Sequence, residues 1–246
     1  MKTFYLPPTD WREPYSLQGR EAKHAVKVMR LSAGDRVRLM DGRGRSGVFE
    51  IEAASKLNLD LKPIEITTHE EPDCRIHLAI KWVKSARRAW LMEKAVELGA
   101  WELIFWQGEH SQGRVPTDPK DTWREKLAEA MKQCANPWLP EIIVLPDGAG
   151  QLAEYASGFD RRYLLWEGRD PESETRLMNP EKVGVSGDAL LVIGPEGGIS
   201  EHEFRILSDS GFAPVSLGRR ILRYETAAIT ALALAWWGAE KQAEEG

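Results

Sequence analysis

The pattern of hydrophobic and polar positions changes its period close to residue 70. Before that point, short alternating segments separated by turn residues predict strands. We expect a hairpin of Arg36–Met40 and Gly47–Ala53 around the turn Asp41–Gly44, and a further strand within Leu57–Ile66. Ahead of them, Ala22, Ala25, Val26 and Met29 have the spacing of a short amphipathic helix. Residues 1–70 are therefore predicted to form a small β-barrel-like domain.

The segment His69–Asp73 has the composition of a linker, and beyond it strands alternate with helices. The predicted strands are Arg75–Trp82, Glu102–Trp106, Glu141–Leu145, Tyr163–Trp166, Ala189–Ile193 and Pro214–Leu217. The predicted helices are Ala86–Leu98, Pro119–Ala135, Ser200–Ser210 and Glu225–Lys241. This alternation predicts an α/β domain over residues 74–246, with a mainly parallel sheet covered on both faces. Ligands of such sheets bind beyond the carboxyl ends of the strands.

One predicted strand ends in an unusual glycine turn, which reads LVIGPEGGISEHEF from Leu191 to Phe204. Ser200 and Glu203 have the spacing of a capping box, so a helix is expected to begin there. No Lys-Ser or Lys-Thr pair follows the glycines, and their spacing does not match G-x-G-x-x-G, so neither a P-loop nor a dinucleotide fingerprint is present. Two interpretations stay open: a ligand that approaches the bare backbone, or a tight turn without a ligand.

A second glycine turn lies at Leu217–Gly218 and leads through several arginines into a strongly apolar helix. Glu225 and Thr226 stand at the start of that helix, where they can satisfy free backbone N–H groups. Because the helix is apolar around most of its circumference, it must be buried on more than one side. It is either the central helix of a monomer or part of a contact with another subunit.

Composition narrows the class of protein. The 246 residues are 42% hydrophobic and 29% charged, as in ordinary globular proteins, and no apolar run is long enough to cross a membrane. The N-terminus lacks an apolar signal core, and Cys74 and Cys134 provide at most one bridge, so a reduced, cytoplasmic protein is expected. The five histidines are scattered, which argues against a metal site.

The net charge of −5 argues against nucleic acid, but the basic residues are not evenly distributed. They outnumber the acids between Arg20 and Arg45, and no acid interrupts the cluster from Lys81 to Arg88. Such local surfaces can hold a phosphate backbone on an acidic molecule, although a solvated face is the equally good alternative.

The two glycine turns resemble the C-terminal signature of a known family. IGPEGGISEHEF and LGRRILRYETAAITAL, in this order, are similar to motifs of the ribosomal RNA small subunit methyltransferase E family, which are SPOUT-class RNA methyltransferases. HAVKVMRLSAGDRVRLMDGRG resembles the family's PUA-like RNA-binding domain, and EKAVELGAWELIFWQGEHS and EAMKQCANPWLPEI resemble its middle segments. The resemblance implies a trefoil-knotted SPOUT domain over 74–246, a PUA-like β-barrel over 1–70, and a homodimer that uses S-adenosylmethionine and no metal.

The reaction that the resemblance implies is methylation of N3 of a uridine in the decoding region of 16S ribosomal RNA. Arg223 is expected to stabilise charge on a uracil oxygen, and Glu225 to accept the proton or orient Arg223, although helix-terminal charge compensation is an equal alternative for Glu225. Glu196 is a weaker catalytic candidate. The residues expected at the cofactor are Ile193, Gly194, Pro195, Glu196, Gly197, Gly198, Leu217, Gly218, Ile221, Leu222, Arg223 and Thr226. The residues expected at RNA are Lys23, Lys27, Arg30, Arg36, Arg43, Arg45, Lys81, Lys84, Arg87 and Arg88.

Two departures from the family pattern bear on the substrate. His110 stands where the family's middle motif has an arginine, and Asn136 stands where a second arginine is expected. Rival interpretations are therefore a SPOUT enzyme that acts on another RNA or on a ribose hydroxyl, and a non-catalytic ribosome-assembly factor. A Rossmann-type dehydrogenase is disfavoured because its fingerprint is absent.

Overall fold

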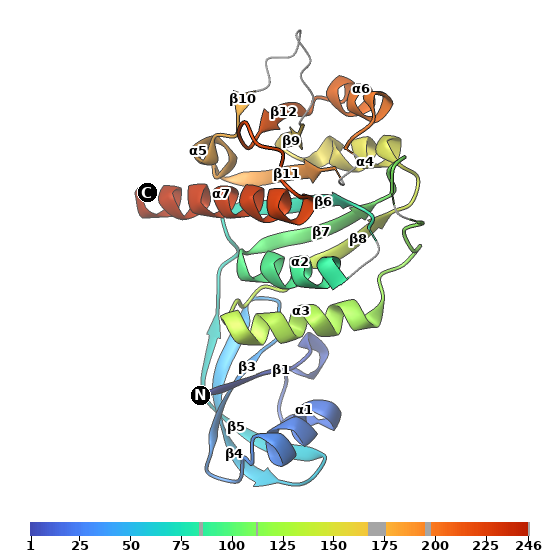
Figure 1. Ribbon diagram of the computed structural model, residues 1–246. Helices are drawn as coiled ribbons and strands as arrows, with labels where there is room; N and C mark the ends of the chain where they lie inside the picture. The colour runs from blue at the N-terminus through green and yellow to red at the C-terminus, as the bar shows by residue number, and fades with distance from the viewer. Residues whose placement is uncertain (84–85, 112, 167–175, 195–197, 246) are drawn as a thin grey trace. The chain divides into compact units, whose positions relative to one another are not determined.

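The computed structural model of the chain describes residues 1–83, 86–111, 113–166, 176–194 and 198–245 (Figure 1). The chain divides into two compact units, which are described separately. One comprises residues 1–71 and 128–139, and the other residues 72–127 and 140–246. The sequence pattern did not predict that residues 128–139 belong to the N-terminal unit.

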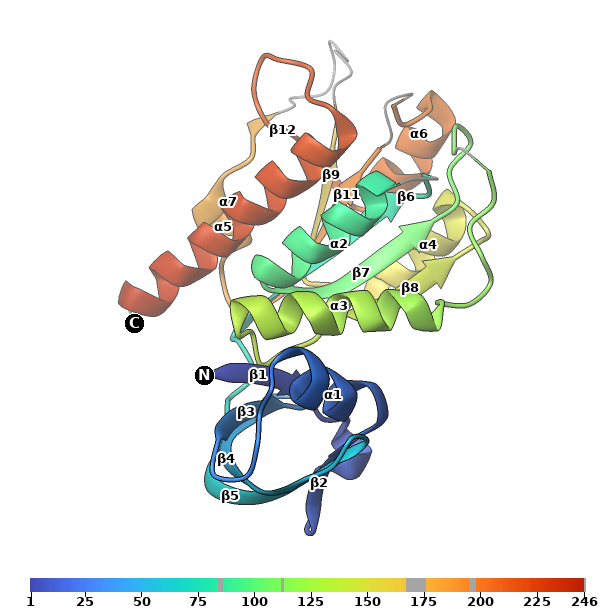
Figure 2. The same cartoon turned by 60° about the horizontal axis from the view of Figure 1, so that its bottom comes forward.

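The N-terminal unit is built on a mixed five-stranded sheet in the order β1-β3-β4-β5-β2. Its strands are β1 (Lys2–Tyr5), β2 (Tyr15–Gln18), β3 (Arg36–Met40), β4 (Arg45–Ala54) and β5 (Asn58–Thr68). β1 pairs parallel with β3 and the other pairs are antiparallel, so the predicted hairpin and the strand after it are confirmed. The sheet curls around a core that includes Phe4, Trp11, Leu17 and Phe49 (Figure 2).

Short helical segments complete this unit. The 3-10 turn η1 spans Pro8–Asp10, and α1 (Gly19–Lys23) continues into a π-helical segment, η2 (His24–Val28). The apolar spacing predicted one helix here, and its inward positions are confirmed, because Ala22 and Ala25 are fully buried. The hairpin turn is held by the buried Asp41, whose Oδ1 accepts the N–H groups of Arg43 and Arg45 at 2.7 and 2.9 Å.

The C-terminal unit contains a seven-stranded, fully parallel sheet in the order β10-β12-β9-β11-β6-β7-β8. Its strands are β6 (Cys74–Lys81), β7 (Ala100–Trp106), β8 (Glu141–Leu145), β9 (Arg161–Leu165), β10 (Arg176–Leu177), β11 (Gly187–Ile193) and β12 (Ala213–Ser216). The chain builds outward from β6 through β7 and β8, then crosses to the other side of β6. The strand order therefore reverses between β6 and β11, and the carboxyl ends of these strands flank a topological switch point.

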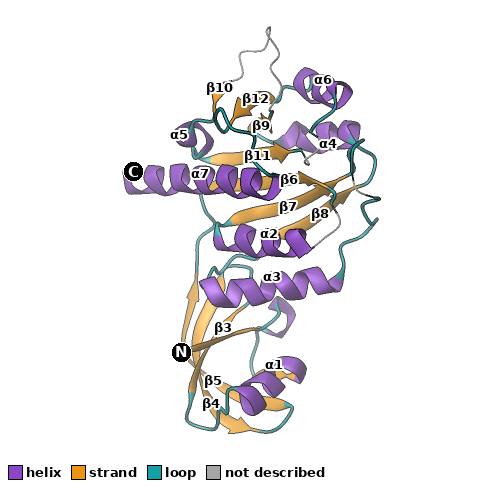
Figure 3. Cartoon of the chain, viewed as in Figure 1, coloured by secondary structure: helices purple, strands orange, loops and turns teal. Residues whose placement is uncertain are grey.

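Helices cover both faces of this sheet, as Figure 3 shows by secondary structure. They are α2 (Ala86–Glu97), α3 (Asp121–Cys134), α4 (Ala149–Tyr155), α5 (Pro180–Val183), α6 (Glu201–Asp209) and α7 (Tyr224–Glu245), with a 3-10 turn η3 at Ala156–Gly158. α2, α5 and α7 lie on one face, and α4 and α6 on the other (Figure 2). Among the described residues, none of the helices has the length and hydrophobicity needed to cross a bilayer.

Candidate functional site

The first glycine loop leaves β11 at its carboxyl end. Ile193 is buried, and a Cβ on Gly194 would lie 2.7 Å from Cγ1 of Ile199, so this glycine lets the loop fold onto itself. Gly198 has a φ of +70°, which a side chain rarely tolerates, and within the described residues no heavy atom surrounds its Cβ position. Pro195, Glu196 and Gly197, which were expected at the cofactor, lie outside the described residues.

The predicted capping box at the start of α6 is confirmed. The Ser200 hydroxyl accepts the N–H of Glu203 at 3.1 Å, and Oε2 of Glu203 accepts the N–H of Ser200 at 2.8 Å. The chain therefore passes from the glycine loop into the helix at a defined angle.

The second glycine loop leaves β12 and enters α7. Gly218 has a φ of +122°, and the described residues leave the space around its Cβ position open. Leu217 and Leu222 are half-buried, Arg223 and Thr226 are exposed, and 84% of Ile221 is exposed. An exposed aliphatic side chain beside a bare-backbone turn is a surface that an apolar or aromatic ligand group can cover.

Glu225 supplies the clearest unsatisfied polar group in this region. Its side chain is only 16% exposed, and its Oε2 atom is buried without a hydrogen-bond partner among the described residues. Its Oε1 atom lies 3.8 Å from Nε of Arg87 on α2. A buried carboxylate oxygen without a donor is costly, so the site suits a ligand that brings an N–H or O–H group.

Lys81, at the carboxyl end of β6, requires a correction. Its side chain is fully buried, and its Nζ atom donates to Oε2 of Glu203 at 2.5 Å and to the carbonyl of Gly198 at 3.2 Å. Burial lowers the pKa of this ammonium below its ordinary value, although the hydrogen bond to Glu203 opposes the shift. The prediction that Lys81 contacts RNA is therefore wrong, because the folded chain gives a phosphate no access to it.

The rest of the second basic cluster divides between packing and surface. The Arg88 guanidinium lies over the Trp82 and Trp123 rings, at 4.1 and 5.1 Å from their centroids, and donates to the Val83 carbonyl at 2.9 Å. Burial lowers the pKa of Arg88, as expected for a half-buried cation that packs on aromatic rings. Arg87 is exposed near Glu225, and Lys84 lies outside the described residues.

The N-terminal cluster is mostly available to solvent. Lys23, Lys27, Arg30, Arg36 and Arg43 are exposed. Arg45 is instead half-buried, because its Nε atom donates to the buried Asp41 at 2.6 Å and its guanidinium lies over the Trp11 ring. Of the two departures from the family pattern, His110 is exposed, and Oδ1 of Asn136 accepts the N–H of Trp138 at 2.9 Å.

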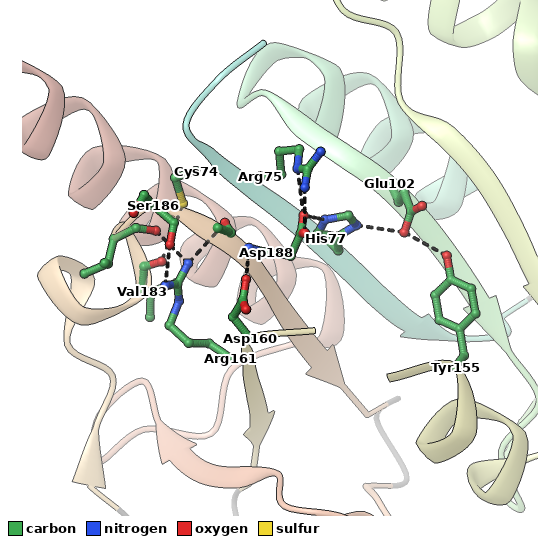
Figure 4. Close-up of polar contacts among 12 residues, drawn as sticks. Cys74, Arg75, His77, Glu102, Tyr155, Asp160, Arg161, Val183, Ser186 and Asp188 are labelled. Atoms are coloured by element: carbon green, nitrogen blue, oxygen red, sulfur yellow. Dashed lines mark hydrogen bonds and ion pairs between the residues drawn. The ribbon is translucent and has the colours of Figure 1, made fainter. Parts of the chain in front are cut away.

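A polar network at the amino edge of the sheet was missed by the sequence interpretation (Figure 4). The ring nitrogens of the buried His77 lie 2.7 Å from Glu102 and 2.9 Å from Asp188. Arg75 binds Asp188 through two nitrogens, and the Tyr155 hydroxyl donates to Glu102 at 2.9 Å. Burial raises the pKa of the Tyr155 phenol. Only sheet register brings these residues together, so the linear sequence carried no signal for them.

Comparison with known proteins assigns the family. A model described as an RNA methyltransferase domain matches residues 69–236, and one described as an RNA methyltransferase PUA domain matches residues 17–64. The chain belongs to this RNA methyltransferase family. Among the curated relatives, the Ribosomal RNA small subunit methyltransferase E of Bacillus subtilis is 27% identical over 225 residues, which are 89% of this chain and 88% of the relative. The predicted family membership is thereby confirmed.

Solved structures agree with this assignment. A Legionella pneumophila protein in complex with the bound cofactor S-adenosylmethionine has a TM-score of 0.81 and 28% identity, covering 95% of this chain and 96% of its own. A Neisseria gonorrhoeae Ribosomal RNA small subunit methyltransferase E has a TM-score of 0.78 at 23% identity, over 95% of each chain, and supports the fold. The predicted arrangement is confirmed: an α/β domain with a parallel sheet follows a PUA-like domain, and the Neisseria structure shares this fold. The trefoil knot stays a prediction.

Proposed function

We propose that this RNA methyltransferase transfers a methyl group from S-adenosylmethionine to N3 of a uridine in the decoding region of 16S ribosomal RNA. The names of the relatives support small-subunit ribosomal RNA as the substrate, and the complex of the Legionella protein supports the cofactor. The observation in this chain that carries the proposal is the buried Oε2 of Glu225, which has no hydrogen-bond partner among the described residues and lies in the first turn of α7, two positions after the exposed Arg223.

The cofactor would lie against the two glycine loops. The described residues assigned to it are Ile193, Gly194, Gly198, Leu217, Gly218, Ile221, Leu222, Arg223 and Thr226. The open backbone at Gly198 and Gly218 and the exposed Ile221 suit a ligand with apolar and polar parts. When bound, S-adenosylmethionine supplies a methyl group already activated by its sulfonium. No metal ligation is assigned, and the described residues contain no cluster of three His, Cys, Asp or Glu side chains that could hold an ion.

The chain's own groups would then act on the uracil. N3 must lose a proton before its lone pair can attack, and a carboxylate is a suitable acceptor when it lies within hydrogen-bond reach. We assign this role to Glu225, whose buried oxygen lacks a donor among the described residues. Arg223 would stabilise the negative charge that develops on a uracil oxygen as the proton leaves.

The N-terminal unit would hold the RNA backbone. Lys23 and Lys27 lie on α1 and η2, Arg30 lies just after η2, and Arg36 and Arg43 are exposed on and beside β3. Contacts of this kind carry affinity without reading sequence. We propose that the chain acts as a homodimer, as the family resemblance implies.

The decisive test is ribosomal RNA mass spectrometry in a strain that lacks the gene. We expect the wild-type chain to restore one methyl group at uridine N3, and Arg223→Ala to lower the rate of modification about 10²-fold. Arg219→Ala is the matched control, because Arg219 is an exposed arginine in the same loop to which no catalytic role is assigned. Full modification by Arg223→Ala would remove that residue from the mechanism.

Other outcomes would select a different function. A methyl group on a ribose oxygen or on another RNA would support the related SPOUT activities. A chain that binds no S-adenosylmethionine in titration calorimetry would point to an assembly factor. For Glu225, loss of stability with unchanged turnover in Glu225→Gln would assign the carboxylate to the helix terminus rather than to catalysis.

A further inference from the structure

Lys81 contacts the first glycine loop and the start of the helix that follows the second glycine loop. Its side chain reaches the first loop, where Nζ donates to the Gly198 carbonyl at 3.2 Å. Its backbone carbonyl accepts the hydroxyl of Tyr224, the first residue of α7, at 3.2 Å. Tyr224 is only 5% exposed, so this bond is shielded from water. One residue at the end of β6 therefore joins the loop after β11 to the first residue of α7, which directly follows the second glycine loop.

The Glu203 carboxylate accepts hydrogen bonds from three residues, one of which is Lys81. Its Oε2 atom accepts Lys81 Nζ at 2.5 Å and the Ser200 N–H at 2.8 Å, while its Oε1 atom accepts the N–H of Glu109 at 2.8 Å. Glu109 belongs to the loop that follows β7. The Glu203 carboxylate thus links the end of the first glycine loop to the loop that follows β7. The buried ammonium of Lys81 balances its charge.

The path of the Lys81 side chain is narrow. A Cβ on Gly108 would overlap the Lys81 stem, so the glycine keeps this channel open. The Nζ atom lies 5.1 Å from the centroid of the buried Trp106 ring. The ammonium therefore has few alternative positions, and its hydrogen bonds have a fixed direction.

A buried ion pair is a poor way to gain stability. Desolvation of both charges offsets most of their attraction, and replacement of such pairs by apolar residues is often neutral or stabilising. The pair of Lys81 and Glu203 does provide a defined geometry, because the ammonium and the carboxylate must lie within hydrogen-bond distance of each other. A displacement of about 1 Å in an active site can lower the reaction rate about 10²-fold. An ion pair that holds ligand-binding loops in place can therefore serve the reaction even when it adds no stability.

We propose that Lys81 is a positioning residue of the donor site, which acts through Glu203 on the first glycine loop and through Tyr224 on the start of α7, where the second glycine loop ends. The inference rests on the proposed binding of S-adenosylmethionine at these loops. It assigns Lys81 no contact with RNA or with the reacting atoms. Its effect should therefore appear in the binding of the donor, not in the binding of RNA.

The test compares two double variants of the full chain. Lys81→Met with Glu203→Gln removes the buried pair without leaving an unpaired buried charge. Glu201→Gln with Arg205→Met is the matched control. It removes an exposed ion pair of α6, in which the two charged groups lie 3.7 Å apart, and α6 is also the helix that carries Glu203. We expect the buried double variant to stay folded and to bind S-adenosylmethionine about tenfold more weakly by calorimetry, the size of effect that follows the loss of a charged hydrogen bond. Its KM for RNA should stay within about twofold of the wild type.

A second variant covers the case in which the double variant does not fold. Tyr224→Phe removes one hydroxyl and one hydrogen bond, and we expect it to weaken donor binding about threefold. Donor affinity equal to the wild type in folded Lys81→Met/Glu203→Gln, or in Tyr224→Phe if the double variant unfolds, would overturn the positioning role. Failure of the wild-type chain itself to bind the donor would instead refute the proposed function.

Discussion

At the residue scale, Asp188 shares its carboxylate between Arg75 and His77 at the amino edge of the parallel sheet. Burial would raise the pKa of Asp188, but the hydrogen bonds from Arg75 and His77 outweigh it and hold that pKa below its usual value. A carboxyl whose pKa is lowered by folding stabilises the protein above its unfolded-state pKa of about 4. That stabilisation disappears as the pH falls through the lower, folded-state value.

We therefore predict that the melting temperature of the wild-type chain falls between pH 5 and pH 3, and that Asp188→Asn shows a shallower fall. Thermal melts at steps across this range measure the difference. Asp209→Asn, on the exposed end of α6, is the control and should follow the wild-type curve. If the melting temperatures of Asp188→Asn and the wild type depended on pH in the same way, the ionisation of Asp188 would not contribute to the pH dependence of stability.

Several charged residues illustrate what sequence can tell at this scale. Lys27 and Lys81 are both lysines in basic segments, yet one is exposed and the other fully buried. Arg43 and Arg45 also differ, because Arg43 is exposed, whereas Arg45 is half-buried and bonds the buried Asp41 through its side chain. The basic clusters could be read from the sequence. The acidic group that each basic side chain bonds in the folded chain could not.

At the scale of elements, the crossing of α5 and α7 depends on two glycines. A Cβ on Gly238 would overlap the Pro180 carbonyl, and a Cβ on Gly184 would overlap the backbone of Gly238. The two helices therefore approach at backbone distance, and an ion pair between Lys241 and Glu181 lies beside the crossing. The atoms nearest to both Cβ positions belong to the backbone, which cannot move aside as a flexible side chain can.

We predict that Gly238→Ala lowers the free energy of unfolding by about 1–3 kcal/mol, since α7 must move away from α5. Urea denaturation followed by circular dichroism measures this. Gly150→Ala, in α4, is the control: its Cβ position is open among the described residues, so the gain in helix propensity should stabilise by about 0.5–1 kcal/mol. Equal effects of the two substitutions would contradict the close crossing.

Most elements of the C-terminal unit could be predicted because their signals are local. The strand pattern before the first glycine turn and the capping box after it predicted β11 and α6, and both are confirmed. α4, α5 and the two-residue β10 were missed. They are too short for a periodic pattern, and α4 contains a glycine. α5 does have a local start signal, because Asn179 caps it and Pro180 is its first residue.

At the scale of the whole molecule, α7 combines a buried stripe with exposed tryptophans. Ala228, Ala231 and Leu232 are fully buried, whereas Trp236 and Trp237 are 38% and 60% exposed. Large exposed aromatic residues beside a buried stripe of the same helix suit a contact with another chain. We predict that the wild-type chain sediments as a homodimer and that Trp237→Glu sediments as a monomer.

Analytical ultracentrifugation over a range of concentrations checks this prediction. Leu57→Glu is the control, because Leu57 is 61% exposed in the turn between β4 and β5, remote in sequence from α7. It should leave the sedimentation coefficient unchanged. A monomeric wild-type chain would remove the homodimer from the proposal and leave the assignment to the family intact.

By itself, the sequence determined the two kinds of sheet, most of their strands, the glycine turns and the family, because period, caps, turns and motifs are properties of neighbouring residues. Only the tertiary structure decided that Lys81 is buried against Glu203, 122 positions away, and that His77 lies between Glu102 and Asp188. Burial and pairing depend on which distant segments the sheet order brings together. A local pattern carries no information about that order. The sequence therefore predicts Lys81 as a surface cation, whereas in the folded chain it is buried and bonds Glu203.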